Sequence, residues 1–487
     1  MPKFDFVGGS YEAANPLQDA QTCINWFPEI DKDDGAKSPI ALLGCPGLTL
    51  AAATGVSGAV RGAWVLPNGT QAVGVVSNKA FLLTKSGSGY TVSIIGTLLT
   101  YTGVVSIRDN GVAKIVVIVD GPNGYTYNLN TSTFAQITDP AWLGSDRVSF
   151  IDGWFVFNKP STQIFYTSPV YWNGSAALDA TYYSLKDSSS DSIVSHIEDR
   201  RELWLIGERT TEVWYDAGNQ YFPFSRLQGA LLQVGCAAAH TVVRTGQGLI
   251  WLSKSERGEH SVVLTQGYNF QTISTPAISN KISQYSTVSD AFAYIYTEAG
   301  HEFYVLTFPT GDATWVYDLT TGLWHQRASY DPIMGVFHRH RSNCCIDFGG
   351  QRIVGDALNG NLWIMSRNVY VDGDTPLVSQ RRTPHVWDKG ERNRVLNHWL
   401  QIEFKPGQGN ATGSGSDPSA LLRWSSDGGF TWPGVRTLKL GKIGEYTRRA
   451  IARRLGAPRD RVYEVTVSDP VNRDVVGATI KAEGAYN

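Results

Sequence analysis

A repeated unit of four short strand-like runs is the feature that most restricts how this chain can fold. The units begin near residues 61, 104, 147, 192, 236, 290 and 334, so neighbouring starts lie 43 to 54 residues apart. The first unit contains the runs Arg61–Val65, Gln71–Val76, Lys79–Leu83 and Tyr90–Ile95. Turn-forming Gly, Asn, Asp, Pro or Ser residues separate the runs, as they do in β-hairpins. Four strands with a period of about 44 residues are typical of one blade of a β-propeller.

Seven units of this kind predict a seven-bladed β-propeller, because closure of a ring protects the edges of small sheets. The longest interval contains Gln271–Ser289, a Ser/Thr-rich segment that we expect to be an insertion or a long loop. A pair of β-sandwiches without radial order is the alternative. The repeat contains no Trp-Asp or kelch signature, so it indicates an architecture and not a function.

The repeat divides the chain into three predicted parts. Residues 1–59 are rich in Gly, Pro and Ala and are expected to form an extended N-terminal arm. Residues 60–372 are the predicted propeller, and residues 373–487 are a C-terminal β-rich domain in which Pro406–Ser419 is a flexible loop. The predicted fold class is all-β. An aromatic content of 11% agrees with this class, because pleated sheets favour aromatic side chains.

Charge and cysteine content exclude several classes of protein. A net charge of −2 excludes a generally basic nucleic-acid-binding protein. However, residues 371–487 carry 18 basic and 13 acidic residues, whereas the rest of the chain carries 24 basic and 31 acidic residues. Opposite net charges in the two parts of the chain favour contacts between neighbouring copies. Five scattered cysteines argue against a disulfide scaffold, and no signal-peptide or membrane-spanning run is visible, so we expect synthesis in a cytoplasm.

A cluster of arginines near the C-terminus is the strongest candidate for a functional surface. Guanidinium groups bind phosphate, and they bind the carboxylates of a partner chain equally well. No ladder of aromatic residues for base stacking accompanies the cluster. We therefore favour a subunit interface, with DNA contact along a channel and a solvated face as alternatives. The cluster consists of Arg448, Arg449, Arg453, Arg454, Arg459 and Arg461.

The segment Ser425–Trp432 fits the Asp-box pattern S-x-D-x-G-x-T-W. In such a hairpin turn Asp427 accepts hydrogen bonds from turn amides, Gly429 takes an unusual backbone angle and Trp432 packs beneath. Sialidases carry several such boxes, but this chain has one, and it lies outside the repeat. A glycosidase also needs a placed pair of carboxylates, and the sequence singles out no pair. We expect a structural turn.

His338, His340, Cys344 and Cys345 form a metal-like cluster in the sequence. Adjacent cysteines point to opposite faces of a strand, and the usual spacing between zinc ligands is missing. We therefore predict no metal site and no cofactor. The sequence also lacks a nucleophile elbow, a phosphate-binding loop and a dinucleotide fingerprint, so it does not indicate an enzyme.

Near its N-terminus the chain has the segments Cys23–Glu29 and Leu42–Leu48, and near its C-terminus the segments Trp424–Gly429 and Arg454–Glu464. In these segments it resembles the packaged-DNA stabilisation proteins of short-tailed bacteriophages, which are also described as tail accessory factors, hub or nozzle proteins. The N-terminal resemblance lies in the pattern N-x-[YF]-P-E followed by L-x-x-x-P-G-L, and further matches are Glu212–Trp214, Val234–Cys236 and Ile273–Ile278. At the C-terminus the matches are Trp424–Gly429, Arg454–Glu464 and Val467–Val471. The motif residues that we expect to be structural are Asn25, Pro28, Glu29, Pro46, Gly47, Asp427, Gly429, Trp432, Asp469 and Pro470.

This resemblance implies a structural virion protein of the phage tail that contains a propeller, in agreement with the repeat. It implies a homohexamer that forms a tube below the portal and adaptor ring, extends the DNA channel and retains packaged DNA. It also implies that the tube seats a distal needle, fibre or tailspike, while DNA passes through the lumen without sequence-specific binding. A glycan-binding or sialidase-like propeller protein is the alternative function.

Overall fold

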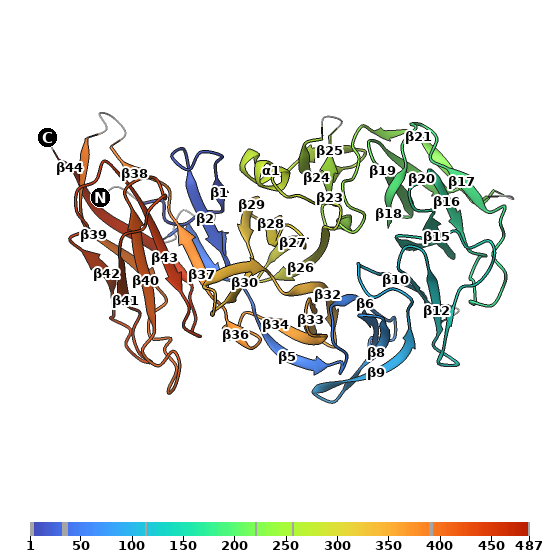
Figure 1. Cartoon of the computed structure of the whole chain (residues 1–487), viewed down its shortest axis with the longest axis horizontal. Coiled ribbons are helices and arrows are strands. Elements are labelled where there is room, and N and C mark those ends of the chain that lie inside the picture. Colours follow the sequence, from blue (N-terminus) through green and yellow to red (C-terminus); the bar gives the residue numbers. More distant parts are fainter. Residues whose placement is uncertain are drawn as a thin grey trace.

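The structure, a computed structural model, describes residues 4–31, 38–112, 114–219, 222–255, 258–388 and 393–485. These residues contain 44 strands and one helix, which confirms the predicted all-β class. Figure 1 shows a ring of small sheets with a β-sandwich beside it. In the described part of the chain, no helix is long and apolar enough to cross a membrane.

Seven sets of four antiparallel strands form the propeller, as predicted, and each set is one blade. Blades 1 to 3 are formed by β6 (Val60–Val65), β7 (Gln71–Val76), β8 (Lys79–Ser86), β9 (Gly89–Thr97), β10 (Ser106–Asn110), β11 (Ile115–Val119), β12 (Gly124–Asn128), β13 (Thr133–Gln136), β14 (Val148–Ile151), β15 (Trp154–Asn158), β16 (Ile164–Thr167) and β17 (Tyr183–Leu185). Blades 4 and 5 are formed by β18 (Ile193–Asp199), β19 (Glu202–Gly207), β20 (Thr211–Asp216), β21 (Phe224–Leu232), β22 (Val243–Arg244), β23 (Leu249–Lys254), β24 (His260–Gln266) and β25 (Asn269–Thr272).

The last of the seven blades takes one strand from another part of the chain. Blade 6 is formed by β26 (Phe292–Glu298), β27 (His301–Phe308), β28 (Ala313–Asp318) and β29 (Leu323–Gln326). Blade 7 is formed by β32 (Ser342–Phe348), β33 (Gln351–Asp356), β34 (Asn361–Ser366) and, as its outer strand, β5 (Gly47–Ala53). An N-terminal strand therefore closes the ring, a point that the repeat left open.

Two short elements fill the longer connections between blades. The helix α1 (Pro276–Ser283) lies inside the predicted insertion, and the hydroxyl of Thr275 caps its N-terminus. The hairpin β30 (Ala328–Asp331) and β31 (Val336–Arg339) precedes blade 7. The seventh unit therefore begins at residue 342 and not near residue 334. A hairpin and an inner blade strand have the same period-2 pattern, so the sequence did not separate them.

The C-terminal domain is a sandwich of two sheets that also takes strands from the N-terminus. The first sheet contains β1 (Tyr11–Glu12), β2 (Ala20–Ile24), β37 (Ser379–Arg382), β38 (Val386–Trp387), β40 (Ser419–Ser425), β41 (Val435–Lys439) and β43 (Asp460–Val467). The second contains β3 (Trp26–Ile30), β4 (Ile40–Gly44), β39 (Arg394–Phe404), β42 (Ala450–Arg453) and β44 (Val475–Ala485). The remaining strands, β35 (Val371–Asp372) and β36 (Thr375–Pro376), lie beside β5.

Burial explains why the middle strands of the blades are continuous apolar runs. All five residues of β11, Ile115–Val119, are buried, because neighbouring blades cover both faces of this strand. The outer strand β13, Thr133–Gln136, is mostly exposed and contains a single large apolar residue. In the sandwich, apolar residues of both sheets pack together around Trp26, Leu422 and Tyr463.

One sheet runs without a break from blade 6 into the sandwich (Figure 1). The strands β29 and β2 are parallel neighbours, with Ile24 opposite Gln326. The backbone N–H of Asn25 continues this pairing at 2.9 Å from the carbonyl oxygen of Gln326. A shared sheet fixes the sandwich against the rim of the ring. The domain boundaries at residues 59 and 372 remain predictions.

Gly47, at the start of the closing strand β5, leaves no room for a side chain. A Cβ atom there would lie 2.3 Å from the carbonyl oxygen of Val369 and 2.5 Å from that of Val371. We expect Gly47→Ala to lower the free energy of unfolding by about 3 kcal/mol, because backbone atoms must move. Gly477→Ala is the matched control, since the nearest atom to its Cβ is the Ser38 Oγ at 3.6 Å. Urea titrations in which both variants change equally would contradict this expectation.

Candidate interaction surface

Two sheet edges lie together on one side of the sandwich. The strand β41 ends the first sheet and β42 ends the second, and the two strands contact each other. Within the described residues, no strand pairs with the outer edge of either. Six basic residues lie on these strands or next to them, and we call this surface the basic edge. It consists of Arg436, Lys439, Arg448, Arg449, Arg453 and Arg454.

Most guanidinium groups of the basic edge have no acidic partner in the chain. Arg449 Nε donates to the amide oxygen of Gln401 at 2.8 Å, and a guanidinium nitrogen of Arg436 donates to the backbone carbonyl of Arg453. Arg448, Arg449, Arg453 and Arg454 are exposed. Among the described residues, none of these four has a carboxylate within ion-pair distance. Charged side chains prevent a free sheet edge from pairing with the strands of other molecules. Carboxylates of a partner protein can bind these guanidinium groups and neutralise their charge.

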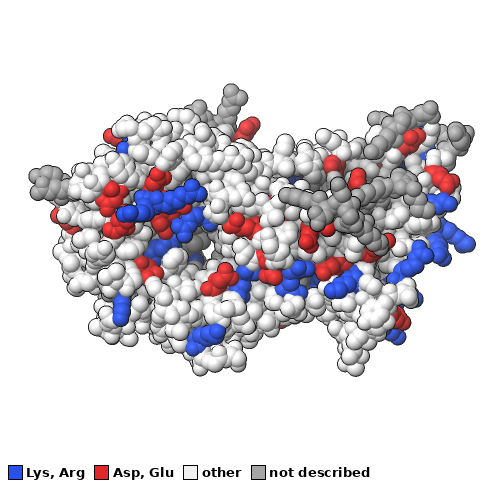
Figure 2. Space-filling model, turned by 180° about the vertical axis from the view of Figure 1, so that it is seen from behind, with Lys and Arg blue, Asp and Glu red and all other residues white. Residues whose placement is uncertain are grey.

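A groove of about 870 Å³ lies beside the basic edge. Tyr446, Arg448 and Arg449 are among the residues that line it, and the Tyr446 side chain is 70% exposed. The neighbouring Ile443 is 62% exposed. The back view shows Lys and Arg side chains gathered on the sandwich (Figure 2). Exposed tyrosine and arginine next to an apolar residue are typical of protein interfaces.

The other two arginines of the predicted cluster lie elsewhere. Arg461 is in β43, and only 4% of it is exposed. Its guanidinium lies 5.6 Å from the ring centre of Trp424 and 5.8 Å from that of Tyr463, and burial lowers its pKa. Arg459 is exposed in the segment that precedes β43. The structure therefore brings four of the six arginines to the basic edge and buries Arg461 inside the sandwich.

The Asp-box forms a closed turn between β40 and β41. Asp427 Oδ1 accepts a hydrogen bond from the backbone N–H of Thr431 at 2.9 Å. Hydrogen bonds from the hydroxyl groups of Ser425 and Thr431 lower the pKa of Asp427. Gly429 has a φ of 102°, and Trp432 Nε1 donates to the Gly429 carbonyl at 3.0 Å. The polar groups of Asp427, Thr431 and Trp432 are used to hold the turn, so the geometry does not favour the glycan alternative.

Asn25 is the hydrogen-bonding joint between the N-terminal segment, the propeller and the sandwich. It is fully buried, with a φ of 55°. Its Nδ2 donates to the carbonyl oxygens of Ala328 at 2.8 Å and Val378 at 2.7 Å. Its Oδ1 accepts from the backbone N–H of Ala328 at 3.0 Å. Asparagine tolerates a positive φ better than most residues, so it can adopt this backbone conformation and also make the three hydrogen bonds.

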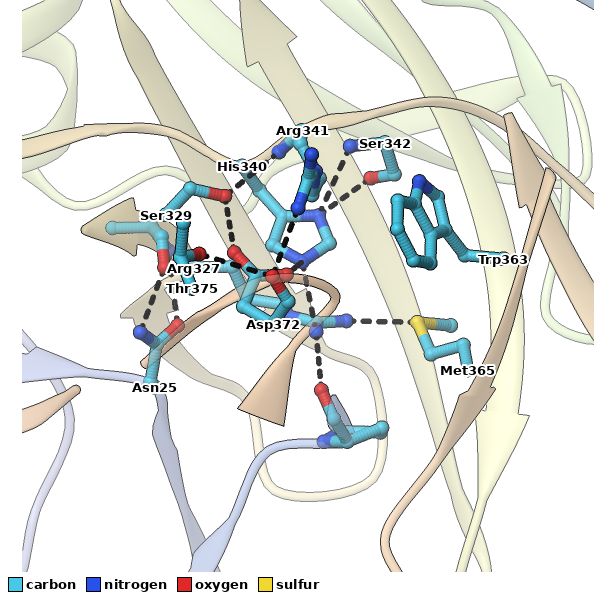
Figure 3. Close-up of polar contacts among 12 residues, drawn as sticks. Asn25, Arg327, Ser329, His340, Arg341, Ser342, Trp363, Met365, Asp372 and Thr375 are labelled. Atoms are coloured by element: carbon cyan, nitrogen blue, oxygen red, sulfur yellow. Dashed lines mark hydrogen bonds and ion pairs between the residues drawn. The ribbon is translucent and has the colours of Figure 1, made fainter. Parts of the chain in front are cut away.

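A buried polar network extends from this joint into blade 7 (Figure 3). Arg327 Nη2 donates to the carbonyl oxygen of Pro46 at 2.7 Å and lies 3.1 Å from His340 Nε2. Its Nη1 lies 3.0 Å from the sulfur of Met365. His340 Nδ1 is 2.6 Å from the Ser342 hydroxyl. The network ties the turn before the closing strand β5 to the inner strand of blade 7.

Arg341 continues the network on the other side of His340 (Figure 3). Its Nε donates to Asp356 Oδ2 at 2.9 Å, and Trp363 Nε1 donates to the same oxygen at 2.7 Å. Its Nη1 donates to the backbone carbonyl of Asp372 at 2.8 Å. The Ser329 hydroxyl donates to the carboxylate of Asp372, whose pKa is raised by burial. These contacts stabilise the junction between the propeller and the sandwich.

The remaining motif residues have local structural contacts. Pro28 is buried in β3 opposite Leu42, whereas Glu29 is exposed. Asp469 Oδ2 accepts a hydrogen bond from the backbone N–H of Ser419 at 2.7 Å. The carbonyl oxygen of Pro470 accepts from Asn410 Nδ2 at 3.3 Å.

The metal-like cluster does not come together. His338 is exposed, and its Nδ1 lies 2.7 Å from Asp312 Oδ2, while His340 belongs to the buried network. Cys344 and Cys345 are neighbours in β32, and burial raises the pKa of the Cys344 thiol to about 12. Within the described ranges, no group of three metal-ligating side chains is assembled.

Sequence reasoning missed three buried arginines, of which Arg327 and Arg381 hold the N-terminal segment and Arg473 holds the residues around Leu377. Arg327, Arg381 and Arg473 are each at most 1% exposed and donate mainly to backbone carbonyls. Arg381 Nε, for example, donates to the carbonyl oxygen of Phe6 at 2.8 Å. Their signal in the sequence is weak, because an arginine between apolar residues in a strand also suits the solvent face.

The comparisons with known proteins agree with this architecture. The family model described as bacteriophage P22 Gp10, beta-propeller, matches residues 6–370. The model described as bacteriophage P22 Gp10, beta-sandwich, matches residues 379–483. The two models meet at the junction network and together cover nearly the whole chain. No curated protein sequence matches it.

One similar solved structure is the extracellular domain of a hybrid two-component system from B. thetaiotaomicron, with 10% sequence identity and a TM-score of 0.45. The similarity covers 85% of this chain and 60% of that one, which is less than two thirds of its length. At this level of similarity no function is transferred. The family models, by contrast, match the propeller and the sandwich separately and in order. The chain therefore belongs to the bacteriophage P22 Gp10 family and is a structural protein of the phage tail that stabilises packaged DNA.

Proposed function

We propose that six copies of this chain form a tube below the portal and adaptor ring, extend the DNA channel and seat a needle, fibre or tailspike. The observation that carries the proposal is the basic edge, whose exposed arginines have no ion-pair partner among the described residues. A closed ring needs a heterologous interface, in which one surface meets a different surface on the next copy. The basic edge supplies one such surface, and the acidic remainder of the chain supplies its complement.

The shared sheet between blade 6 and the sandwich supports a fixed angle between neighbouring copies. Because β29, β2 and β37 belong to the same sheet, the basic edge keeps its orientation relative to the propeller. A ring closes only if each copy repeats the same rotation. The buried network around Asn25 and Arg327 stabilises the same junction.

The DNA path in this proposal lies between the copies and not along the propeller axis. The axial cavity of one propeller measures about 480 Å³ and is lined by side chains of its inner strands. Arg147 is one of the lining residues, and its Nη1 donates to the carbonyl oxygens of Ala239 at 2.9 Å and Val242 at 3.2 Å. A lumen with little net charge also suits release, because each neutralised phosphate adds to the affinity for DNA.

The proposed role is non-enzymatic, and the proposed location is the tail of the virion. The one glycosidase-like pattern in the chain is a structural turn. The alternative of DNA contact by the basic edge is distinguished from a subunit interface by the experiment below.

Reversing two charges on the basic edge is expected to weaken assembly. The mass of the wild type with the portal–adaptor complex should correspond to six copies per ring by light scattering. We expect the double variant Arg453→Glu, Arg454→Glu to need at least about tenfold more protein to assemble, because like charges at an interface cost more than 1 kcal/mol. Both side chains are exposed, so the subunit should remain folded.

The matched control reverses an adjacent pair of arginines on the propeller. Arg200 and Arg201 are 75% and 82% exposed, and the variant Arg200→Glu, Arg201→Glu makes the same change in charge. It should assemble like the wild type. Virions that assemble normally with the basic-edge variant but lose their DNA would instead assign the basic edge to DNA. A wild-type monomer that ignores the adaptor would contradict the tube.

A further inference from the structure

The axis of the propeller contains a cavity whose lining includes four arginines. Its volume is about 480 Å³, and residues in or beside the inner strands of all seven blades line it. In the back view the face of the propeller is hollowed, and Lys and Arg side chains border the hollow (Figure 2). A second cavity of about 630 Å³ shares lining residues with the first and extends it toward one face of the ring.

Four arginines line the cavity, and the first two, Arg61 and Arg108, lie in or beside the inner strands of blades 1 and 2. The Nε of Arg61 donates to the carbonyl of Gly103, and its other nitrogens donate to further carbonyls and a hydroxyl. Arg108 Nη1 donates to the Ile107 carbonyl at 2.9 Å, and its Nε lies 3.5 Å from Glu198 Oε1. No hydrogen bond within the described residues uses Arg108 Nη2. The hydrogen bonds of Arg61 therefore stabilise the fold, whereas the Nη2 group of Arg108 is left as an unused donor within the described residues.

The other two arginines of the lining, Arg147 and Arg244, also have N–H groups without a hydrogen-bond partner among the described residues. Arg147 is 91% buried, and its Nη1 bridges two carbonyls, while its Nη2 has no hydrogen-bond partner in the described part of the chain. Burial lowers the pKa of Arg147 to about 10, so this group is still charged at neutral pH. Arg244, at the end of β22, is exposed and has no ion-pair partner among the described residues.

The charge of the lining is not balanced. Its acidic residues are Glu198, which faces Arg108, and Asp347, which lies 3.2 Å from Arg352 outside the cavity. Among the described residues, no carboxylate lies within ion-pair distance of the buried Arg147, and the charge of Glu198, which faces Arg108, offsets that of Arg147 only from further away. Burying a charge without a partner is costly, so an anion that enters the cavity gains more there than at the surface.

We propose that the axial cavity binds a small oxyanion of the phosphate class, held by Arg108, Arg147 and Arg244. Guanidinium groups offer paired N–H donors that match the oxygens of such an anion. A water molecule takes up about 30 Å³, so the cavity has room for an anion with part of its hydration shell. The phosphate group can come from free phosphate or from a nucleic-acid strand, because the chemistry is the same. This site lies apart from the basic edge and does not depend on the proposed tube.

The test uses inorganic phosphate and the full chain in a phosphate-free buffer. Calorimetric titration should give a dissociation constant below a millimolar, and phosphate should raise the Tm more than chloride at the same ionic strength. The exposed Arg244→Gln should weaken binding by a few fold without affecting the fold. The double variant Arg108→Gln, Arg244→Gln should weaken it by at least about tenfold, because it removes two of the three charged donors at once.

The matched control removes the same charge from the sandwich, as Arg453→Gln, Arg454→Gln. It should bind phosphate like the wild type. No heat and no difference from chloride in the wild type would overturn the proposal, and so would an equal loss in both double variants. A short single-stranded oligonucleotide that competes with phosphate, and needs the same arginines, would identify nucleic acid as the source. Phosphate binding without competition would identify the free ion.

Discussion

The variant Asn25→Ala is expected to lose about 4 kcal/mol of its free energy of unfolding. The substitution leaves the carbonyls of Ala328 and Val378 and the N–H of Ala328 buried without a partner. Each unsatisfied group costs roughly 1 kcal/mol or more, and alanine at a φ of 55° adds about another 1 kcal/mol. Urea titration followed by tryptophan fluorescence measures the loss.

A second substitution separates the two causes. Asn25→Gly removes the same three hydrogen bonds but accepts the positive φ without strain. It should be more stable than Asn25→Ala by about 1 kcal/mol and still clearly less stable than the wild type. If both variants lost less than 1 kcal/mol, Asn25 would not be the joint between the propeller and the sandwich that its contacts indicate.

Acidification from pH 7.5 to pH 5.5 is expected to lower the free energy of unfolding by roughly 4 kcal/mol. His196, His325 and His340 are completely buried. Burial lowers the pKa of His196 and His325 to about 3 and that of His340 well below its usual value. All three are neutral in the folded chain, and they take up protons only when it unfolds. Below the unfolded value of about 6.5, each contributes about 1.4 kcal/mol of loss per pH unit.

Some groups oppose this trend in part. Burial raises the pKa of Asp372, and the carboxylate of Asp460 raises the pKa of His385, so the folded chain binds these protons more tightly. The variant His325→Phe provides the control. Its ring lies among Phe27 and Phe303, and neither ring nitrogen has a hydrogen-bond partner in the described residues. We expect it to reduce the loss between the two pH values by about 1.4 kcal/mol, the contribution of one buried histidine. A stability that does not change between the two pH values would contradict the argument.

Several elements could be read directly from the amino-acid order. Alternating apolar residues and turn residues at a period of about 44 predicted the seven blades, and the limits of β7, Gln71–Val76, agree with the predicted run. These signals are local, because each strand and each turn depends on neighbouring residues. The Asp-box turn around Asp427 was predicted for the same reason.

The candidate surface was only partly predictable. The arginines between residues 448 and 461 are adjacent in sequence, but β42 and β43 belong to different sheets, so the fold exposes Arg453 and buries Arg461. The sequence pattern of β43 contains no feature that distinguishes an arginine under Trp424 from one in solvent.

The sequence by itself determined the repeat, the all-β class and the family, since each depends on residue types at short, regular spacing. Only the tertiary structure decided that β5 closes blade 7, that Asn25 joins three segments and that the axial arginines share one cavity. Each of these contacts connects residues that lie far apart along the chain. Their partners are fixed by ring closure and by burial of unpaired polar groups, which are properties of the whole fold and not of any short segment.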